Sequence, residues 1–217
     1  DERHAKPKTQ SEHDTNNYDL GRIGQHNIAI AILPRYGTNE AAIVASKMQS
    51  TFPGLRFVLM VGIGGGVHSA TNDIRLGDLV ISLPDEQGGG VIQYDFGREG
   101  TLEFTRIGSL NRPPSLLMTA VASMRAEFAL GKKVQKIVQK TVSKTEGSDA
   151  LWTYPGAEQD VHFADTYDHI ERRPNCKDSI EKAAPGDYLH FDDRDHSYPA
   201  IHYGNSGSGN TDMKNEK

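Results

Sequence analysis

Two short apolar runs with an amphipathic segment between them constrain the fold of this chain more than any other feature. The runs span residues 28–33 and 57–61, and each is typical of a strand that is buried on both faces. Apolar side chains at helical spacing predict a helix over residues 38–52, which ends at Pro53. Strands that alternate with helices indicate an α/β fold.

The same patterns predict more elements on both sides of this unit. A short strand and a turn are expected at residues 18–27, before the first run. Further strands are predicted at residues 78–82, 90–96, 103–107 and 200–204, and helices at 113–128 and 132–143. Residues 1–17 are polar and are expected to form a solvated lead-in.

Core-forming residues are concentrated in the first two thirds of the chain. Leu, Ile, Val and Phe make up 38 of the 125 residues in 18–142 but only 8 of the 75 in 143–217. The second stretch also carries 15 acidic residues against 8 basic ones. Because so few apolar residues offset little ordering entropy, residues 143–198 are expected to be an acidic, poorly ordered insertion in a domain spanning 18–217.

The composition also excludes several classes of protein. The single Cys176 rules out a disulfide framework, and no run approaches the about 18 apolar residues of a membrane span. The net charge of -5 gives no reason to expect nucleic acid or an anionic membrane as a partner. No signal-peptide pattern opens the chain, so a cytoplasmic protein is expected.

A glycine-rich turn, residues 62–66, follows the second apolar run. Glycines in such a place let backbone N–H groups approach an anion or a sugar oxygen. A Walker loop is excluded because Val67 and His68 stand where Lys and Ser or Thr are needed. A dinucleotide fingerprint is excluded because Val67 occupies the place of its third glycine. A ligand-binding turn and a tight structural turn both remain open.

A wider pattern joins this turn to other parts of the chain. It consists of the stretches LGRIGQHNIAIAILPRYGTNEAA, LMVGIGGGV, DIRLGDLVIS, GGVIQYDFG and IHYGNSGSGN, in this order. Together they resemble the purine and uridine phosphorylase superfamily, and most closely its fungal members at the head of larger multidomain proteins. The resemblance covers residues 18–217.

The resemblance implies a mixed β-sheet that is partly closed into a barrel and flanked by helices. It implies cleavage of the N-glycosidic bond of a purine nucleoside, with no metal or other cofactor and with phosphate or water as nucleophile. The glycine turn would lie beside the ribose, and the backbone of residues 208–210 would reach the purine. The implied substrate-binding residues are Gly62, Ile63, Gly64, Gly65, Ser208, Gly209, Asn210 and, as an apolar wall, Met213.

Two positions bear on the nucleophile. Phosphorylases of the superfamily place an Arg just before the glycine turn and a Ser inside it. Met60 and Ile63 stand there in this chain, and neither side chain donates a hydrogen bond to phosphate. Hydrolysis is therefore favoured over phosphorolysis. Arg22 and Arg75 could supply a substitute cation, although ordinary surface arginines are the more common outcome.

The resemblance also implies parts outside these residues. In the superfamily a strand precedes the equivalent of Asp1, and an acidic ribose clamp and a base-protonating Asp follow the equivalent of Lys217. No catalytic residue is assigned here, and the chain by itself is expected to turn over nucleosides poorly. The alternative is a non-catalytic nucleoside-sensing module. The expected partners are a purine nucleoside and further domains of a longer chain, or other copies of this one.

Histidine and acidic residues cluster at residues 162–169, where a metal site is conceivable from the residue types. His162, Asp165, Asp168 and His169 could ligate a metal, but no HExxH or paired-Cys spacing supports a site. A solvated acidic loop is the favoured interpretation, and no metal site is predicted. Of the remaining histidines, His202 is expected nearest to a pocket, with a structural histidine as the more common outcome.

Overall fold

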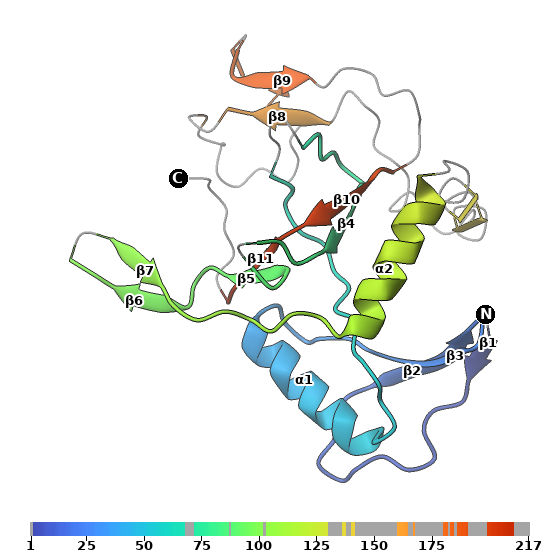
Figure 1. Cartoon of the computed structure of the whole chain (residues 1–217). Helices are drawn as coiled ribbons and strands as arrows, with labels where there is room; N and C mark the ends of the chain where they lie inside the picture. Colours follow the sequence, from blue (N-terminus) through green and yellow to red (C-terminus); the bar gives the residue numbers. More distant parts are fainter. Residues whose placement is uncertain are drawn as a thin grey trace. The chain divides into compact units, whose positions relative to one another are not determined.

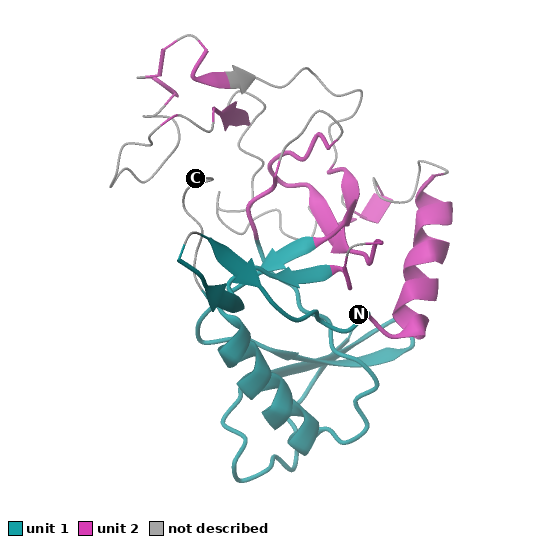
Figure 2. Cartoon of the chain, turned by 60° about the vertical axis from the view of Figure 1, so that its left-hand side comes forward, with its two compact units in different colours: residues 1–63, 91–112, 206–212 teal, residues 64–90, 113–205, 213–217 magenta. Residues whose placement is uncertain are grey.

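The computed structural model describes two compact units, coloured separately in Figure 2. Unit 1 comprises residues 1–63, 91–112 and 206–212, and unit 2 comprises 64–90, 113–205 and 213–217. The described residues are 2–67, 72–86, 88–101, 103–129, 136, 137, 140, 141, 160–164, 167, 180, 181, 183, 184, 186–190 and 199–210. Each unit is a mixture of helix and short strands (Figure 1).

Unit 1 begins with a three-stranded antiparallel sheet in the order β1-β2-β3. Its strands are β1 (Glu2–His4), β2 (Tyr18–Ile23) and β3 (His26–Ala31). The hairpin between β2 and β3 turns at Gly24, whose φ of 57° suits glycine. The strand predicted at residues 28–33 is present as β3, which begins and ends two residues earlier. It is not buried on both faces, because Ile30 is half exposed.

Helix α1 (Thr38–Thr51) supplies the small core of unit 1. Val44 and Met48 are buried together with Tyr18 of β2. The Phe52 ring meets the Tyr18 ring edge-on, with centroids 4.9 Å apart. The helix and its end before Pro53 are therefore confirmed. The local pattern identified the correct face but missed Val44, which lies at its centre.

Residues 2–17 are mostly exposed but make specific contacts with the rest of unit 1. β1 pairs with β2, and Arg3 lies opposite Gly21. Asp14 is buried, and its Oδ2 accepts hydrogen bonds from the hydroxyls of Tyr18 and Thr51, each at 2.5 Å. A polar side chain such as Asp14 can be buried in this way when remote partners satisfy it.

The remaining strands of unit 1 form two pairs. β5 (Val91–Gln93) runs parallel to β11 (Ser206–Ser208), and β6 (Gly97–Glu99) runs antiparallel to β7 (Phe104–Arg106). β5 lies within the strand predicted at 90–96, and β7 lies within the one predicted at 103–107. No sequence pattern predicts β11, because the glycine and serine content of the segment is typical of a loop.

Unit 2 contains a second parallel pair and a helix. β4 (Leu79–Ser82) pairs with β10 (Ile201–Gly204), and both strands agree with predictions. Helix α2 (Ser115–Phe128) follows Pro113 and Pro114 as expected. The guanidinium of Arg125 lies 4.8 Å from the centre of the Tyr203 ring, which joins α2 to β10. β8 (Val161–Phe163) and β9 (Tyr188–His190) form an antiparallel pair that the sequence pattern did not reveal.

Two expectations about the fold are corrected. Residues 57–61 form no strand, and Val61 is 88% exposed. The described residues form several small sheets and two helices, with no closed barrel. Of the helix predicted at 132–143, the structure describes residues 136, 137, 140 and 141, which are helical, and most of the segment 143–198 lies outside the described residues.

Candidate functional site

The ends of β5 and β11 bring two distant segments of unit 1 together. Ser206 lies opposite Val91 and Ser208 opposite Gln93, in parallel register. The backbone N–H of Tyr94 continues the pairing by donating to the carbonyl of Ser208 at 3.0 Å. Because parallel strands end at the same edge, the residues after β5 lie beside those after β11.

The position of the Tyr94 ring explains the glycines at positions 207 and 209. A Cβ atom at Gly209 would lie 2.6 Å from Cζ of the Tyr94 ring, closer than side chains approach one another. At Gly207 it would lie 3.4 Å from Cδ1 of the same ring. The glycines thus allow the aromatic ring to pack directly on the backbone.

Asp95 fixes the backbone of Asn210. The N–H of Asn210 donates to Oδ2 of Asp95 at 2.5 Å, and Nε2 of Gln93 donates to Oδ1 at 3.1 Å. The hydrogen bond from Asn210 and then that from Gln93 lower the pKa of Asp95 below its ordinary value. Asp95 is therefore ionised at neutral pH and holds no proton to donate.

The side chain of Asn210 reaches the start of α1. Its Oδ1 accepts hydrogen bonds from the N–H and the hydroxyl of Thr38, each at 3.0 Å, and from the N–H of Asn39 at 3.5 Å. The residue at the N-cap position is Gly37, which has no side chain to cap the helix. Thr38, whose hydroxyl is of the kind that caps helices, is instead the first helical residue. We call Thr38, Tyr94, Asp95, Gly209 and Asn210 the Asn210 junction.

Three of the predicted substrate-binding residues lie at this junction. Ser208, Gly209 and Asn210 come together there, whereas Met213 lies outside the described residues. The sequence does not mark Tyr94, Asp95 or Thr38 as binding residues, although all three lie within the stretches that carry the resemblance. Asp and Asn side chains readily bind backbone N–H groups, and this was the signal that could have linked Asp95 to Asn210.

The glycine turn is open and exposed. Gly62, Gly64 and Gly65 adopt no left-handed backbone conformation, and a Cβ atom at any of them would meet nothing within 4 Å. Ile63 is fully exposed. Neither the backbone nor the described neighbours therefore require glycine at these positions. At Gly66, by contrast, a Cβ atom would lie 2.7 Å from Cγ2 of Ile74, so close packing does require glycine at this position. Gly62 and Ile63 belong to unit 1, and Gly64 and Gly65 belong to unit 2.

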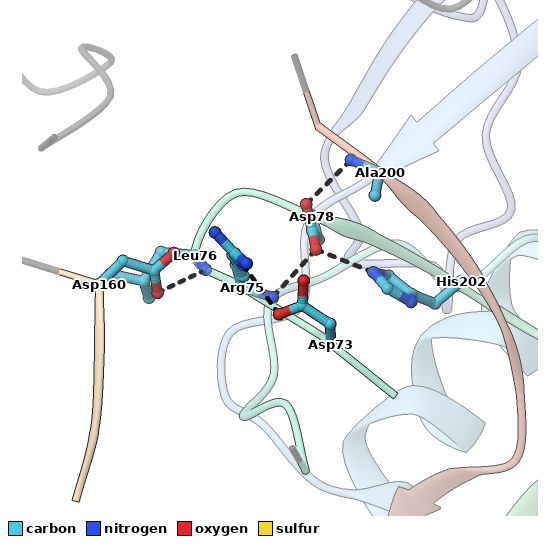
Figure 3. A network of polar contacts seen from close by, with 7 residues as sticks. All are labelled: Asp73, Arg75, Leu76, Asp78, Asp160, Ala200 and His202. Atoms are coloured by element: carbon cyan, nitrogen blue, oxygen red, sulfur yellow. Dashed lines mark hydrogen bonds and ion pairs between the residues drawn. The ribbon is translucent and has the colours of Figure 1, made fainter. Parts of the chain in front are cut away.

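A separate polar network orders the start of β4 in unit 2 (Figure 3). The carboxylate of Asp78 accepts the N–H groups of Arg75 and Ala200, both at 2.9 Å. Its Oδ2 also lies 2.8 Å from Nε2 of His202, and the Asp78 side chain is only 2% exposed. These contacts fix β10 against β4, and they agree with a structural role for His202.

The two candidate cations for phosphate each face a carboxylate. Nε of Arg75 donates to Oδ1 of Asp73 at 2.8 Å (Figure 3). The guanidinium of Arg22 lies 3.3 Å from Glu2. A guanidinium engaged in this way is a weaker partner for phosphate than one held ready for it.

Neither a metal-binding cluster nor a membrane-spanning helix is found among the described residues. They contain no group of three or more His, Cys, Asp or Glu residues placed to hold a metal ion. Of the histidine cluster considered above, His162 is described, whereas Asp165, Asp168 and His169 are not. Within the described part of the chain, no helix has both the length and the apolar character needed to cross a membrane.

Comparison with known proteins gives one informative relative. The chain is 46% identical over 214 residues to a nucleotide-binding leucine-rich repeat (NLR)-like protein of Hyaloscypha variabilis. The match covers 99% of this chain but 20% of the relative, so the chain spans only a small part of that protein. No family model and no solved structure matches the chain.

Proposed function

We propose that this chain is a purine nucleoside-binding domain whose reaction is cleavage of the N-glycosidic bond, with water as the preferred nucleophile. One observation carries the proposal. Three stretches that carry the superfamily resemblance meet at the Asn210 junction, although Thr38 and Asn210 are separated by 172 residues. A shared ligand site would account for such a convergence of motifs.

The proposed contacts are made mainly by backbone groups. Packing against Tyr94 leaves no room for a side chain at Gly209, so its peptide groups are what a ligand would meet there. The open space around Gly62, Gly64 and Gly65 likewise leaves their peptide groups approachable. Peptide groups can bind sugar hydroxyls and the polar edge of a purine without charged side chains.

The choice of water over phosphate rests on the residues around the glycine turn. A phosphate dianion needs cationic or hydrogen-bonding partners. Met60 and Ile63 are both exposed and can donate no hydrogen bond, and Arg22 and Arg75 face carboxylates. Water needs only a polar environment and a base, so hydrolysis makes fewer demands on these residues.

Cleavage also needs a proton donor for the departing purine. A positioned acid typically contributes about 10²–10⁴-fold in rate. Asp95 cannot serve as this acid at neutral pH, because its pKa is lowered by the hydrogen bond from the Asn210 backbone and by Gln93. We therefore expect the acid to be supplied by a longer protein that contains these residues.

The second candidate function is nucleoside sensing without catalysis. The name of the relative favours it, because that protein is described as nucleotide-binding leucine-rich repeat (NLR)-like and not as an enzyme. In this function the same junction would bind the nucleoside, and the missing acid would never be supplied.

Base release separates the two functions. The chain alone and the longer protein are incubated with adenosine, inosine, guanosine or uridine, with and without phosphate, and free base is measured by chromatography. We expect slow or no release by the chain alone and faster, phosphate-independent release of purines by the longer protein. Equal rates from both would show that an acid within residues 1–217 does the work. No release by the longer protein would favour sensing.

A further inference from the structure

We propose that Asn210 is a positioning residue whose side chain holds the start of α1, so that the Ser208 and Gly209 backbone is presented to the ligand in a fixed position. This inference rests on the proposed function, because it concerns the same nucleoside site. It differs from a direct role in binding, in which the Asn210 amide would itself recognise the purine.

Helix α1 depends on a remote residue for its N-terminal cap. The first turn of a helix leaves backbone N–H groups without partners, and a side-chain oxygen at the N-cap normally accepts one of them. Gly37 offers none, and Oδ1 of Asn210 takes this place by accepting the N–H of Thr38 at 3.0 Å. A Cβ atom at Gly37 would lie 2.9 Å from this Oδ1, so glycine makes room for the remote cap.

Asn210 is held through both its side chain and its backbone. Its side-chain oxygen faces the Thr38 hydroxyl and N–H groups, while its own backbone N–H donates to the Asp95 carboxylate at 2.5 Å. A hydrogen bond to an ionised acceptor is stronger than one between neutral groups. The oxygen and the N–H of Asn210 are thus committed to protein contacts.

The short segment between β11 and Asn210 is fixed at both ends. Ser208 is fixed by its place opposite Gln93 and by the bond from Tyr94 N–H to its carbonyl. Gly209 lies between this anchor and Asn210, against the Tyr94 ring. A segment fixed at both ends keeps its peptide groups in one arrangement, and such preorganisation strengthens binding.

Substitutions at Asn210 test the proposal with two readouts. Asn210→Ala removes the capping oxygen, whereas Asn210→Asp keeps it and removes the amide donor. Asn111→Ala changes another exposed asparagine of unit 1 and is the matched control. The readouts are hydrogen exchange of peptides containing the first turn of α1, and the dissociation constant for adenosine and inosine.

We expect Asn210→Ala to speed exchange of the first turn of α1 about fivefold, as loss of a cap does. Its nucleoside affinity should fall by a similar factor. Asn210→Asp should restore slow exchange and most of the affinity, because a carboxylate oxygen also caps a helix start. Asn111→Ala should change neither readout.

Three results would separate the alternatives. If Asn210→Asp lost as much affinity as Asn210→Ala while keeping slow exchange, capping of α1 would not determine the affinity and the positioning role would be wrong. Unchanged exchange in Asn210→Ala would also overturn it. If the wild type bound no nucleoside while Asn210→Ala still exchanged faster, the proposed function would fail and only the capping role would stand.

Discussion

Tyr18 and Asp14 form a buried polar pair at the centre of the unit 1 core. The Tyr18 hydroxyl donates to Asp14 and accepts a hydrogen bond from Nδ2 of Asn16 at 2.9 Å. Burial, followed by the hydrogen bond to Asp14, raises the pKa of Tyr18 to about 12. Burial alone would raise the pKa of Asp14, but hydrogen bonds from Thr51, Tyr18 and Asn16 and the charge of Lys47 together lower it.

The raised pKa of Tyr18 predicts a loss of stability at alkaline pH. The folded chain retains the phenol proton above pH 10.0, the ordinary pKa, where the unfolded chain releases it. Its contribution is therefore complete below pH 10 and is lost as the pH rises toward 12. Denaturant unfolding at several pH values should show this fall in the wild type and in Tyr36→Phe, whose ring is exposed.

Tyr18→Phe should behave differently in the same experiment. It should lower the free energy of unfolding by about 1–3 kcal/mol at neutral pH, because Asp14 and Asn16 lose a partner. It should also remove the extra alkaline loss that the other two proteins share. An identical alkaline profile in all three would show that Tyr18 is not responsible.

At the scale of elements, α1 should contribute most to the stability of unit 1. Met48 is 6% exposed and packs with Val44 and Tyr18, whereas Ile43 on the same helix is 49% exposed. Met48→Ala should lower the free energy of unfolding by about 2 kcal/mol or more. Ile43→Ala should cost about 0.5 kcal/mol or less. Similar losses in thermal or denaturant unfolding would contradict this packing.

Local sequence patterns predicted the elements whose formation depends mainly on their own residues. α1 and α2 follow from apolar side chains at helical spacing, and Leu117, Val121, Met124 and Phe128 indeed form a less exposed stripe on α2. β4 and β10 follow from runs of apolar residues. β8, β9 and β11 escaped prediction because strands of three residues depend on pairing with remote segments, which no local pattern records.

The failure at residues 57–61 has the same physical origin. The run is apolar enough for a buried strand, but a strand needs hydrogen-bonding partners along its edges. The described residues supply none, and Leu59 and Met60 are 65% and 69% exposed. Likewise, the resemblance indicated the β11 segment as part of the site, but only the structure shows that Asp95 and Thr38 hold Asn210.

At the scale of the whole molecule, the chain corresponds to a small part of a much longer relative. It covers 20% of that NLR-like protein. In the proposed function, binding and catalysis are assigned to different residues. The Asn210 junction and the glycine turn would bind the nucleoside, and the acid for cleavage would come from a longer protein that contains these residues.

Calorimetric titration of adenosine and inosine into three proteins tests nucleoside binding at the glycine turn most directly. The proteins are the wild type, Gly65→Val, and Gly54→Val as a matched control. A Cβ atom at either glycine would meet nothing within 4 Å, so both variants should fold as the wild type does. We expect the wild type and Gly54→Val to bind alike and Gly65→Val to bind at least about tenfold more weakly. Equal affinity in all three, or no binding by the wild type, would contradict a nucleoside site at this turn.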